Sequence, residues 1–226
     1  QPIQAISELL ADKPTISFHV DAVQALAKIP TEKYLTNRVD FATFSSHKFH
    51  GVRGVGFVYI KSGKKITPLL TGGGQERDYR STTENVAGIA ATAKALRLAM
   101  EKLDIFTSKT GQMKSVIRQA LLDYPDIFAF SDEEDFTPHI LTFGIKGVRG
   151  EVIVHAFEDY DIFISTTSAC SSKAGKPAGT LIAMGVDKDK AQSAVRLSLD
   201  LENDMSQVEQ FLTKLKLIYN QTRKVR

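Results

Sequence analysis

Residues 39–60 read VDFATFSSHKFHGVRGVGFVYI, and this stretch decides the fold class. Residues 39–44 and residues 54–60 (GVGFVYI) are short runs rich in β-branched and aromatic side chains, and a similar run precedes them at residues 15–20 (TISFHV). Strand-like runs that are apolar on both faces and separated by helices or loops are typical of a layered α/β fold rather than a sandwich. The sequence therefore predicts three strands of an α/β layer.

The pattern changes after this layer. Glycines 72–74 predict a flexible turn, and residues 84–103 form a long helical pattern rich in Ala and Leu. Beyond it the sequence predicts alternating helices and strands: helices over 109–122, 149–158 and about 204–222, and strands over 139–145, 162–166 and 194–199. We therefore expect two domains, over residues 1–105 and residues 106–226, with the second a small α/β domain.

Composition and charge exclude several classes of function. The 226 residues are 42% hydrophobic and 24% charged, and a net charge of +3 spread along the chain makes no nucleic-acid footprint. No apolar run approaches the roughly 18 to 20 residues of a membrane span, and nothing at the start resembles a signal peptide. One cysteine cannot form an internal disulfide, and the histidines lack metal-ligand spacing. We expect a cytoplasmic protein without a metal, a membrane contact or direct nucleic-acid binding.

Two segments carry residues suited to cofactor chemistry. In FSSHKFHG (44–51), Lys48 follows a strand-like run and stands among hydroxyl and imidazole side chains. A deprotonated lysine forms a Schiff base with an aldehyde cofactor, whose phosphate needs hydroxyl, imidazolium or amide donors. In HVDAVQ (19–24), Asp21 is placed at a strand end, where a carboxylate can pair with a protonated pyridine nitrogen. Taken separately, Lys48 also fits a solvated loop lysine, and Asp21 also fits a helix N-cap.

Two residues of the second domain are candidates for substrate chemistry. Cys170 lies in STTSACSS (165–172) just after a strand-like run, so we expect a mobile loop with an exposed thiol rather than a buried small hydrophobe. A free thiol has a pKa of about 8.5, so a neighbouring group is expected to help form the nucleophilic thiolate. Arg196 lies mid-strand in AVRLSL (194–199), where its burial is costly, and a guanidinium binds a carboxylate through two hydrogen bonds.

The motifs HVDAVQ, FSSHKFHG followed by GVGFVYI, and GGGQERDYRSTT (72–83) resemble, in order and spacing, those of the class V aminotransferases, and specifically the cysteine desulfurases. SACSS (168–172) is similar to the active-site loop of their long-loop group. The resemblance implies a fold-type I enzyme that uses pyridoxal 5'-phosphate. Residues 1–105 then correspond to the C-terminal part of the large, mainly parallel domain, and residues 106–226 to the small domain with the cysteine loop.

The resemblance also implies the residues that hold the cofactor. Lys48 would carry it as a Schiff base and later act as the base for the substrate's α-proton. Asp21 is similar to the partner of the pyridine nitrogen, and Gln24 to the residue that hydrogen-bonds the ring hydroxyl. Ser45 and His47 match the phosphate ligands of the family.

The remaining implied roles concern the substrate and the partners. Cys170 would take sulfur from L-cysteine as a persulfide, leaving L-alanine, and Arg196 would bind the substrate carboxylate. Thr83 matches a threonine that reaches the phosphate of the neighbouring subunit, which implies a homodimer with shared active sites. The persulfide would pass to an acceptor protein, either an iron–sulfur scaffold or a tRNA-thiolation enzyme.

Other functions stay open from the sequence: a selenocysteine lyase, a small-substrate aminotransferase, or a non-catalytic scaffold that kept the motifs. Family members are longer than this chain. Their N-terminal half supplies an aromatic group stacked on the cofactor, a further phosphate-binding turn and an asparagine near the ring hydroxyl. We therefore expect the whole protein to be an active desulfurase, and the 226-residue fragment to bind cofactor poorly and to be inactive.

Overall fold

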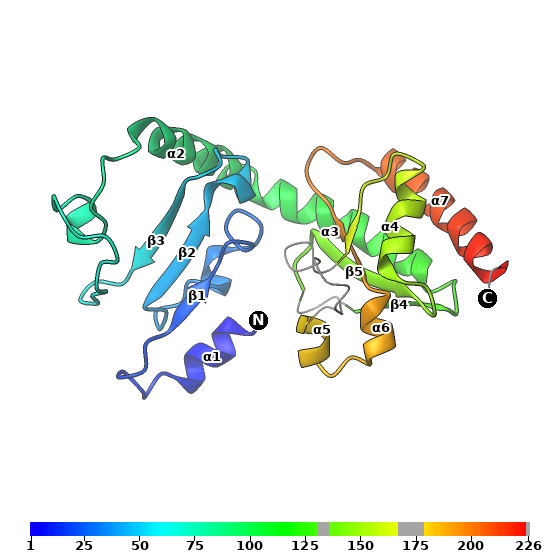
Figure 1. Ribbon diagram of the computed structural model, residues 1–226, viewed down its shortest axis with the longest axis horizontal. Helices are drawn as coiled ribbons and strands as arrows, with labels where there is room; N and C mark the ends of the chain where they lie inside the picture. The colour runs from blue at the N-terminus through cyan, green and yellow to red at the C-terminus, as the bar shows by residue number, and fades with distance from the viewer. Residues whose placement is uncertain (131–135, 167–178, 225–226) are drawn as a thin grey trace. The chain divides into compact units, whose positions relative to one another are not determined.

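The computed structural model describes residues 1–130, 136–166 and 179–224, which form two compact units, Gln1–Asp104 and Ile105–Arg226 (Figure 1). Each unit has its own sheet and its own hydrophobic core. Among the helices of the described ranges, none combines the length and the apolar character that a membrane crossing requires.

The first unit is built on a sheet with the strand order β1-β2-β3, formed by β1 (His19–Asp21), β2 (Phe41–Ser45) and β3 (Gly56–Ile60). Strand β1 runs parallel to β2, and β3 runs antiparallel to it (Figure 1). The three predicted strands are therefore confirmed, although each begins two to four residues later than expected. Between them and after them lie the helical elements α1 (Ile3–Leu9), η1 (Thr31–Lys33), η2 (Ser46–Phe49), η3 (Glu76–Asp78) and α2 (Val86–Met100).

Burial alternates along the central strand of this sheet. Ala42 and Phe44 are buried, while the residues on either side of them are half-buried. The edge strand β3 is less buried, because its apolar residues Phe57 and Val58 are both exposed. Phe57 nevertheless stacks on Phe44, with ring centroids 4.7 Å apart, so it still shields part of the strand beside it.

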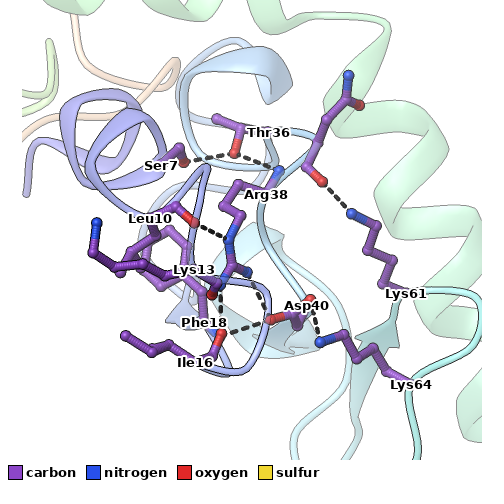
Figure 2. A network of polar contacts seen from close by, with 11 residues as sticks. Ser7, Leu10, Lys13, Ile16, Phe18, Thr36, Arg38, Asp40, Lys61 and Lys64 are labelled. Atoms are coloured by element: carbon purple, nitrogen blue, oxygen red, sulfur yellow. Dashed lines mark hydrogen bonds and ion pairs between the residues drawn. The ribbon is translucent and has the colours of Figure 1, made fainter.

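A buried carboxylate joins the three strands at their common end (Figure 2). Asp40 precedes β2, is 2% exposed, and accepts a hydrogen bond from the backbone N–H of Phe18 at 2.8 Å. Its other bonds are ion pairs with Arg38 at 2.8 Å and Lys64 at 3.2 Å. Burial alone would raise the pKa of Asp40, but the Phe18 N–H and the two cations outweigh it and hold the pKa below its ordinary value.

The guanidinium of Arg38 ties the segment after α1 to the same point (Figure 2). Its Nε donates to the carbonyl oxygen of Leu10 at 2.8 Å, and a terminal nitrogen donates to the carbonyl oxygens of Lys13, at 2.9 Å, and Ile16. These bonds occupy the main chain just before β1, which explains why the predicted strand over 15–20 begins only at His19.

The second unit has an antiparallel sheet with the order β4-β5-β7-β6. Its strands are β4 (Ile127–Ala129), β5 (Ile140–Ile145), β6 (Ser165–Thr166) and β7 (Val195–Ser198). Its helices are α3 (Leu103–Leu121), α4 (Gly150–Glu158), α5 (Gly179–Ala183), α6 (Lys188–Gln192) and α7 (Met205–Lys224). The predicted strands over 139–145 and 194–199 are confirmed, that over 162–166 is reduced to its last two residues, and β4 was not predicted.

One face of this second sheet packs against helices. Leu141 lies opposite Leu197 and Phe143 opposite Val195, and all four belong to one buried cluster with apolar residues of α3, α4 and α7. Thr142 and Arg196, which alternate with these residues, lie on the other face because successive side chains of a strand point to opposite sides. The unit therefore has an apolar inner face and a second face that carries polar groups.

Candidate active site

The lysine predicted to bind the cofactor lies on a short helical turn, η2, that directly follows β2. A 3₁₀ helix has three residues per turn, so residues three apart share a face. Ser46 and Phe49 form the buried face, with 0% and 1% exposure, whereas His47 is exposed and Lys48 is half-buried. Ser46 and Phe49 therefore anchor the turn in the core. The side chains of His47 and Lys48 lie off this buried face.

The backbone that follows the lysine turn restricts which amino acids can occupy it. His50 adopts a left-handed conformation (φ 65°) that ends η2, and the N–H of Gly51 donates to the carbonyl oxygen of Ser46 at 3.0 Å. A side chain at Gly51 would place its Cβ 2.0 Å from the hydroxyl oxygen of Ser46. The N–H of Ser46 in turn donates to the carbonyl oxygen of Val55. Glycine is therefore required at position 51, and the ends of the turn are fixed.

Asp21 ends the neighbouring parallel strand. It lies opposite Thr43, and the next N–H, that of Ala22, donates to the Thr43 carbonyl oxygen at 3.1 Å. The exposed Asp21 carboxylate accepts one hydrogen bond, from the N–H of Val23 at 3.1 Å, so it caps the turn after β1. Gln24 is exposed within the same turn.

The parallel pairing brings several predicted residues to one edge of the sheet. Asp21 and Ser45 are the last residues of β1 and β2, and His47 and Lys48 follow Ser45 directly. Open α/β sheets bind ligands outside the carboxyl ends of parallel strands, which is where these side chains start. The half-buried Ser45, rather than the fully buried Ser46, is the hydroxyl available to a ligand.

Three predicted residues are not part of this group. Thr83 is exposed in the segment between η3 and α2. Arg196 lies on β7 of the second unit, half-buried, and its Nε is a buried nitrogen without a hydrogen-bond partner among the described residues. An unsatisfied buried donor costs about 1 to 3 kcal/mol, so this N–H is suited to an incoming acceptor such as a carboxylate. Cys170 lies outside the described residues.

Sequence reasoning missed the polar support behind the lysine turn. The hydroxyl of Ser46 is hydrogen-bonded to that of Thr92 in α2, at 2.9 Å. A single threonine in an Ala-rich helical run was the available signal, but nothing in the sequence pairs it with a serine 46 positions earlier. Within the described parts of the chain, no group of three or more His, Cys, Asp or Glu residues is placed to hold a metal ion.

Comparisons with known proteins identify the family of this chain. The family model described as Aminotransferase class-V matches residues 1–211. A NifS/IcsS protein homolog of Lactobacillus delbrueckii subsp. bulgaricus is 49% identical over 226 residues, which cover 100% of this chain and 59% of that protein. The cysteine desulfurase IscS of Clostridium botulinum is 36% identical over 229 residues, covering 100% of this chain and 57% of its own. A solved structure of a NifS-like protein matches with a TM-score of 0.85 and 36% identity, over 97% of this chain and 57% of that one.

The chain has the fold of part of a fold-type I domain, and the predicted fold class is confirmed by the solved structures. The chain belongs to the class V aminotransferase family, and its resemblance to the cysteine desulfurases is confirmed. It spans 57% to 59% of the length of the relatives just described.

The family depends on pyridoxal 5'-phosphate, and the described residues fit that group. The amine of Lys48 suits an aldehyde, and the exposed carboxylate of Asp21 suits a protonated ring nitrogen. The side chains of Ser45 and His47 supply donors for a phosphate. Together they provide three kinds of contact from the ends of two adjacent strands.

Proposed function

We propose that the whole protein is a cysteine desulfurase that converts L-cysteine to L-alanine and keeps the sulfur as a persulfide on Cys170. The observation that carries this proposal is the shared strand edge from which Asp21, Ser45 and Lys48 start. Relatives of 36% identity that are named cysteine desulfurase support this choice within the family. In this proposal residues 1–105 are the C-terminal part of the cofactor-binding domain, and residues 106–226 are the small domain.

Each cofactor-binding residue then has a defined task. Bound pyridoxal phosphate supplies an electron sink for the negative charge that develops at the substrate's α-carbon. Lys48 holds the cofactor through its amine and, once released, removes the α-proton as a general base. Asp21 keeps a proton on the ring nitrogen, with Gln24 beside the ring hydroxyl. Ser45 and His47 donate to the phosphate.

The substrate is handled from the second unit. Arg196 binds the carboxylate of L-cysteine, which satisfies its buried Nε–H. The thiolate of Cys170 attacks the substrate sulfur, so that an S–S bond forms while the carbon–sulfur bond breaks. The electron pair of the broken bond stays with the β-carbon, which is then protonated, and the α-carbon regains the proton held by the Lys48 amine to give alanine. The sulfur is left on Cys170, ready for transfer.

The proposed enzyme is a homodimer in which Thr83 reaches the phosphate of the partner subunit's site. Large apolar side chains exposed near this segment, Leu69 at 94% and Val86 at 71%, support its burial against a second copy. The acceptor of the persulfide is an iron–sulfur scaffold or a tRNA-thiolation enzyme. The cytoplasmic location stays a prediction.

The deciding experiment compares the whole protein with its Cys170→Ala variant, supplied with L-cysteine, pyridoxal phosphate and a reducing thiol. We expect equal amounts of alanine and sulfide from the first, and a loss of both, by at least about a hundredfold, from the variant because the nucleophile is missing. An aminotransferase would keep its activity without this thiol. A non-catalytic scaffold would give no turnover from either protein.

The inactivity of the 226-residue chain by itself is a separate proposal. An absorbance titration of this chain with pyridoxal phosphate tests it, and we expect no saturable Schiff-base band at micromolar cofactor. A tight band at Lys48 would contradict the proposal and would show that the residues at the strand edge are sufficient for binding.

A further inference from the structure

A pair of hydroxyl groups is buried directly behind the lysine turn. Ser46, at 0% exposure, and Thr92, at 6%, lie with their side-chain oxygens 2.9 Å apart. The Thr92 hydroxyl also contacts the carbonyl oxygen of Gly88, one helical turn earlier in α2, at 2.7 Å. This carbonyl gives the pair an acceptor within the helix, so both buried hydroxyls are satisfied.

The hydroxyl pair joins the lysine turn to a long helix. Helix α2 packs against η2, and a Cβ at Gly88 would come within 2.8 Å of the side chain of Val55, whose carbonyl oxygen accepts a hydrogen bond from the N–H of Ser46. Ser46 is bonded through its backbone to Val55 and Gly51, and through its side chain to Thr92. Among the side chains of η2, that of Ser46 thus makes a directional bond to α2.

We propose that Thr92 is a positioning residue for Lys48, which acts through the hydroxyl of Ser46. The pair fixes the rotation of the turn about its axis, and this rotation sets where the amine lies relative to Asp21 and Ser45. The inference rests on the proposed role of Lys48 as the cofactor-binding lysine. Thr92 itself touches neither substrate nor cofactor.

The physical chemistry of buried hydroxyls makes the inference specific. Removing one hydroxyl of a buried pair leaves the other unsatisfied, whereas replacing both by apolar groups of similar shape is close to neutral. Thr92→Val should therefore disturb the turn. Thr92→Ser keeps the hydroxyl and should not. The double change Ser46→Ala with Thr92→Val removes the unsatisfied hydroxyl and should restore local stability, but it lacks the bond that fixes the turn, so the placement of the amine should stay altered.

The test uses the whole protein and two measurements. In the cofactor-free protein, amide hydrogen exchange is followed at Ser46 and Gly51, and we expect about tenfold faster exchange in Thr92→Val. In the cofactor-bound protein, the pH midpoint of the Schiff-base absorbance is followed, and we expect a shift of about half a pH unit or more in Thr92→Val. Thr92→Ser should stay within about threefold in exchange and within about 0.2 pH units. The double variant should stay within about threefold in exchange but keep the shifted pH midpoint, because no bond is left to fix the turn; a midpoint that returned to the original value would overturn the inference.

Each contrary result has a defined meaning. Faster exchange with an unchanged pH midpoint would overturn the inference, because the hydroxyl pair would then support the fold without placing the amine. A shift in Thr92→Ser as large as that in Thr92→Val would overturn it as well. A Schiff-base band that survives Lys48→Ala would instead refute the proposed role of Lys48, whatever the exchange data show.

Discussion

The two ends of the β1–β2 strand pair each carry a carboxylate, but the two differ in burial and in bonding. At the amino end, Asp40 is buried and bonded to one backbone N–H and two cations. At the carboxyl end, Asp21 is exposed and accepts one hydrogen bond from its own turn. At the amino end the carboxylate is fully bonded within the protein, while at the carboxyl end polar side chains are available to a ligand. Under the proposed function, stability and ligand binding are therefore separated along the same two strands, and we expect that each end can be perturbed independently.

The largest expected effect falls on the carboxyl end. If Lys48 has its proposed role, Lys48→Ala should lower alanine formation from cysteine in the whole protein by about a thousandfold or more, because the cofactor would lose its covalent attachment and the substrate its base. The free energy of unfolding should change by less than about 0.5 kcal/mol, since the half-buried amine is not part of the core. Steady-state kinetics and urea titration measure the two quantities.

The opposite result is expected at the amino end. Asp40→Ala should destabilise the protein by about 3 kcal/mol, because it leaves Arg38, with 14% of its side chain exposed, without its counter-ion. Urea titration of the first unit's unfolding measures the loss. The cofactor-binding side chains should keep their places in the protein that remains folded, so an equal fall in turnover per folded molecule would contradict the separation of the two ends.

The same carboxylate predicts a pH dependence. The pKa of Asp40 is lower in the folded protein than its ordinary value of 3.8, so the folded state binds this proton more weakly than the unfolded state. Its contribution to stability is therefore fully present above about pH 5 and is lost as the pH falls below 4, through the folded pKa. The stability difference between the original protein and Asp40→Ala should shrink between pH 6 and pH 3 in urea titrations at fixed ionic strength.

A smaller loss of stability is expected from a substitution beside the lysine turn, at the carboxyl end of the strand pair. Gly51→Ala should destabilise the protein by about 1 to 3 kcal/mol, because the added Cβ overlaps the Ser46 hydroxyl. It should also weaken cofactor binding, since the overlap displaces the lysine turn. Gly54→Ala is the matched control: no atom lies within 4 Å of its added Cβ, so its cost comes only from the positive φ of 78°. Equal losses of cofactor binding in the two variants would contradict the steric explanation.

The smallest effect is expected for Lys64→Ala. The Lys64 side chain is 31% exposed and pairs with Asp40 at 3.2 Å, so its removal should cost only about 0.5 to 1 kcal/mol. Raised salt should reduce this difference, because exposed charges are screened. A loss as large as that of Asp40→Ala would mean that Lys64, rather than Arg38, neutralises the buried carboxylate.

The sequence was most informative where structure is local. The runs that became β2, β3, β5 and β7 are short, apolar and bounded by turn residues, and the Ala-rich pattern became α2. The placement of Asp21 at a strand end and of Lys48 just after one also followed from the local sequence. Strand β4, three residues long (Ile127–Ala129), was missed.

What the sequence could not reveal depends on contacts between distant segments. Asp40 stands within a predicted strand, but two of the three partners that stabilise its burial, Phe18 and Lys64, come from other segments. The bond between Ser46 and Thr92 has the same character. Strand β6 begins only at Ser165; before it Asp161 takes a left-handed conformation (φ 58°) and Phe163 is 78% exposed. None of these features has a periodicity that a single sequence displays.

The guanidinium of Arg38 binds main-chain oxygens of Leu10, Lys13 and Ile16, not their side chains. A carbonyl oxygen is present whichever amino acid occupies the position, so substitutions across residues 10–16 leave these acceptors in place. Insertions or deletions there change the spacing of the three oxygens and break the set. During evolution, residues 10–16 should therefore tolerate amino-acid substitutions far more readily than insertions or deletions.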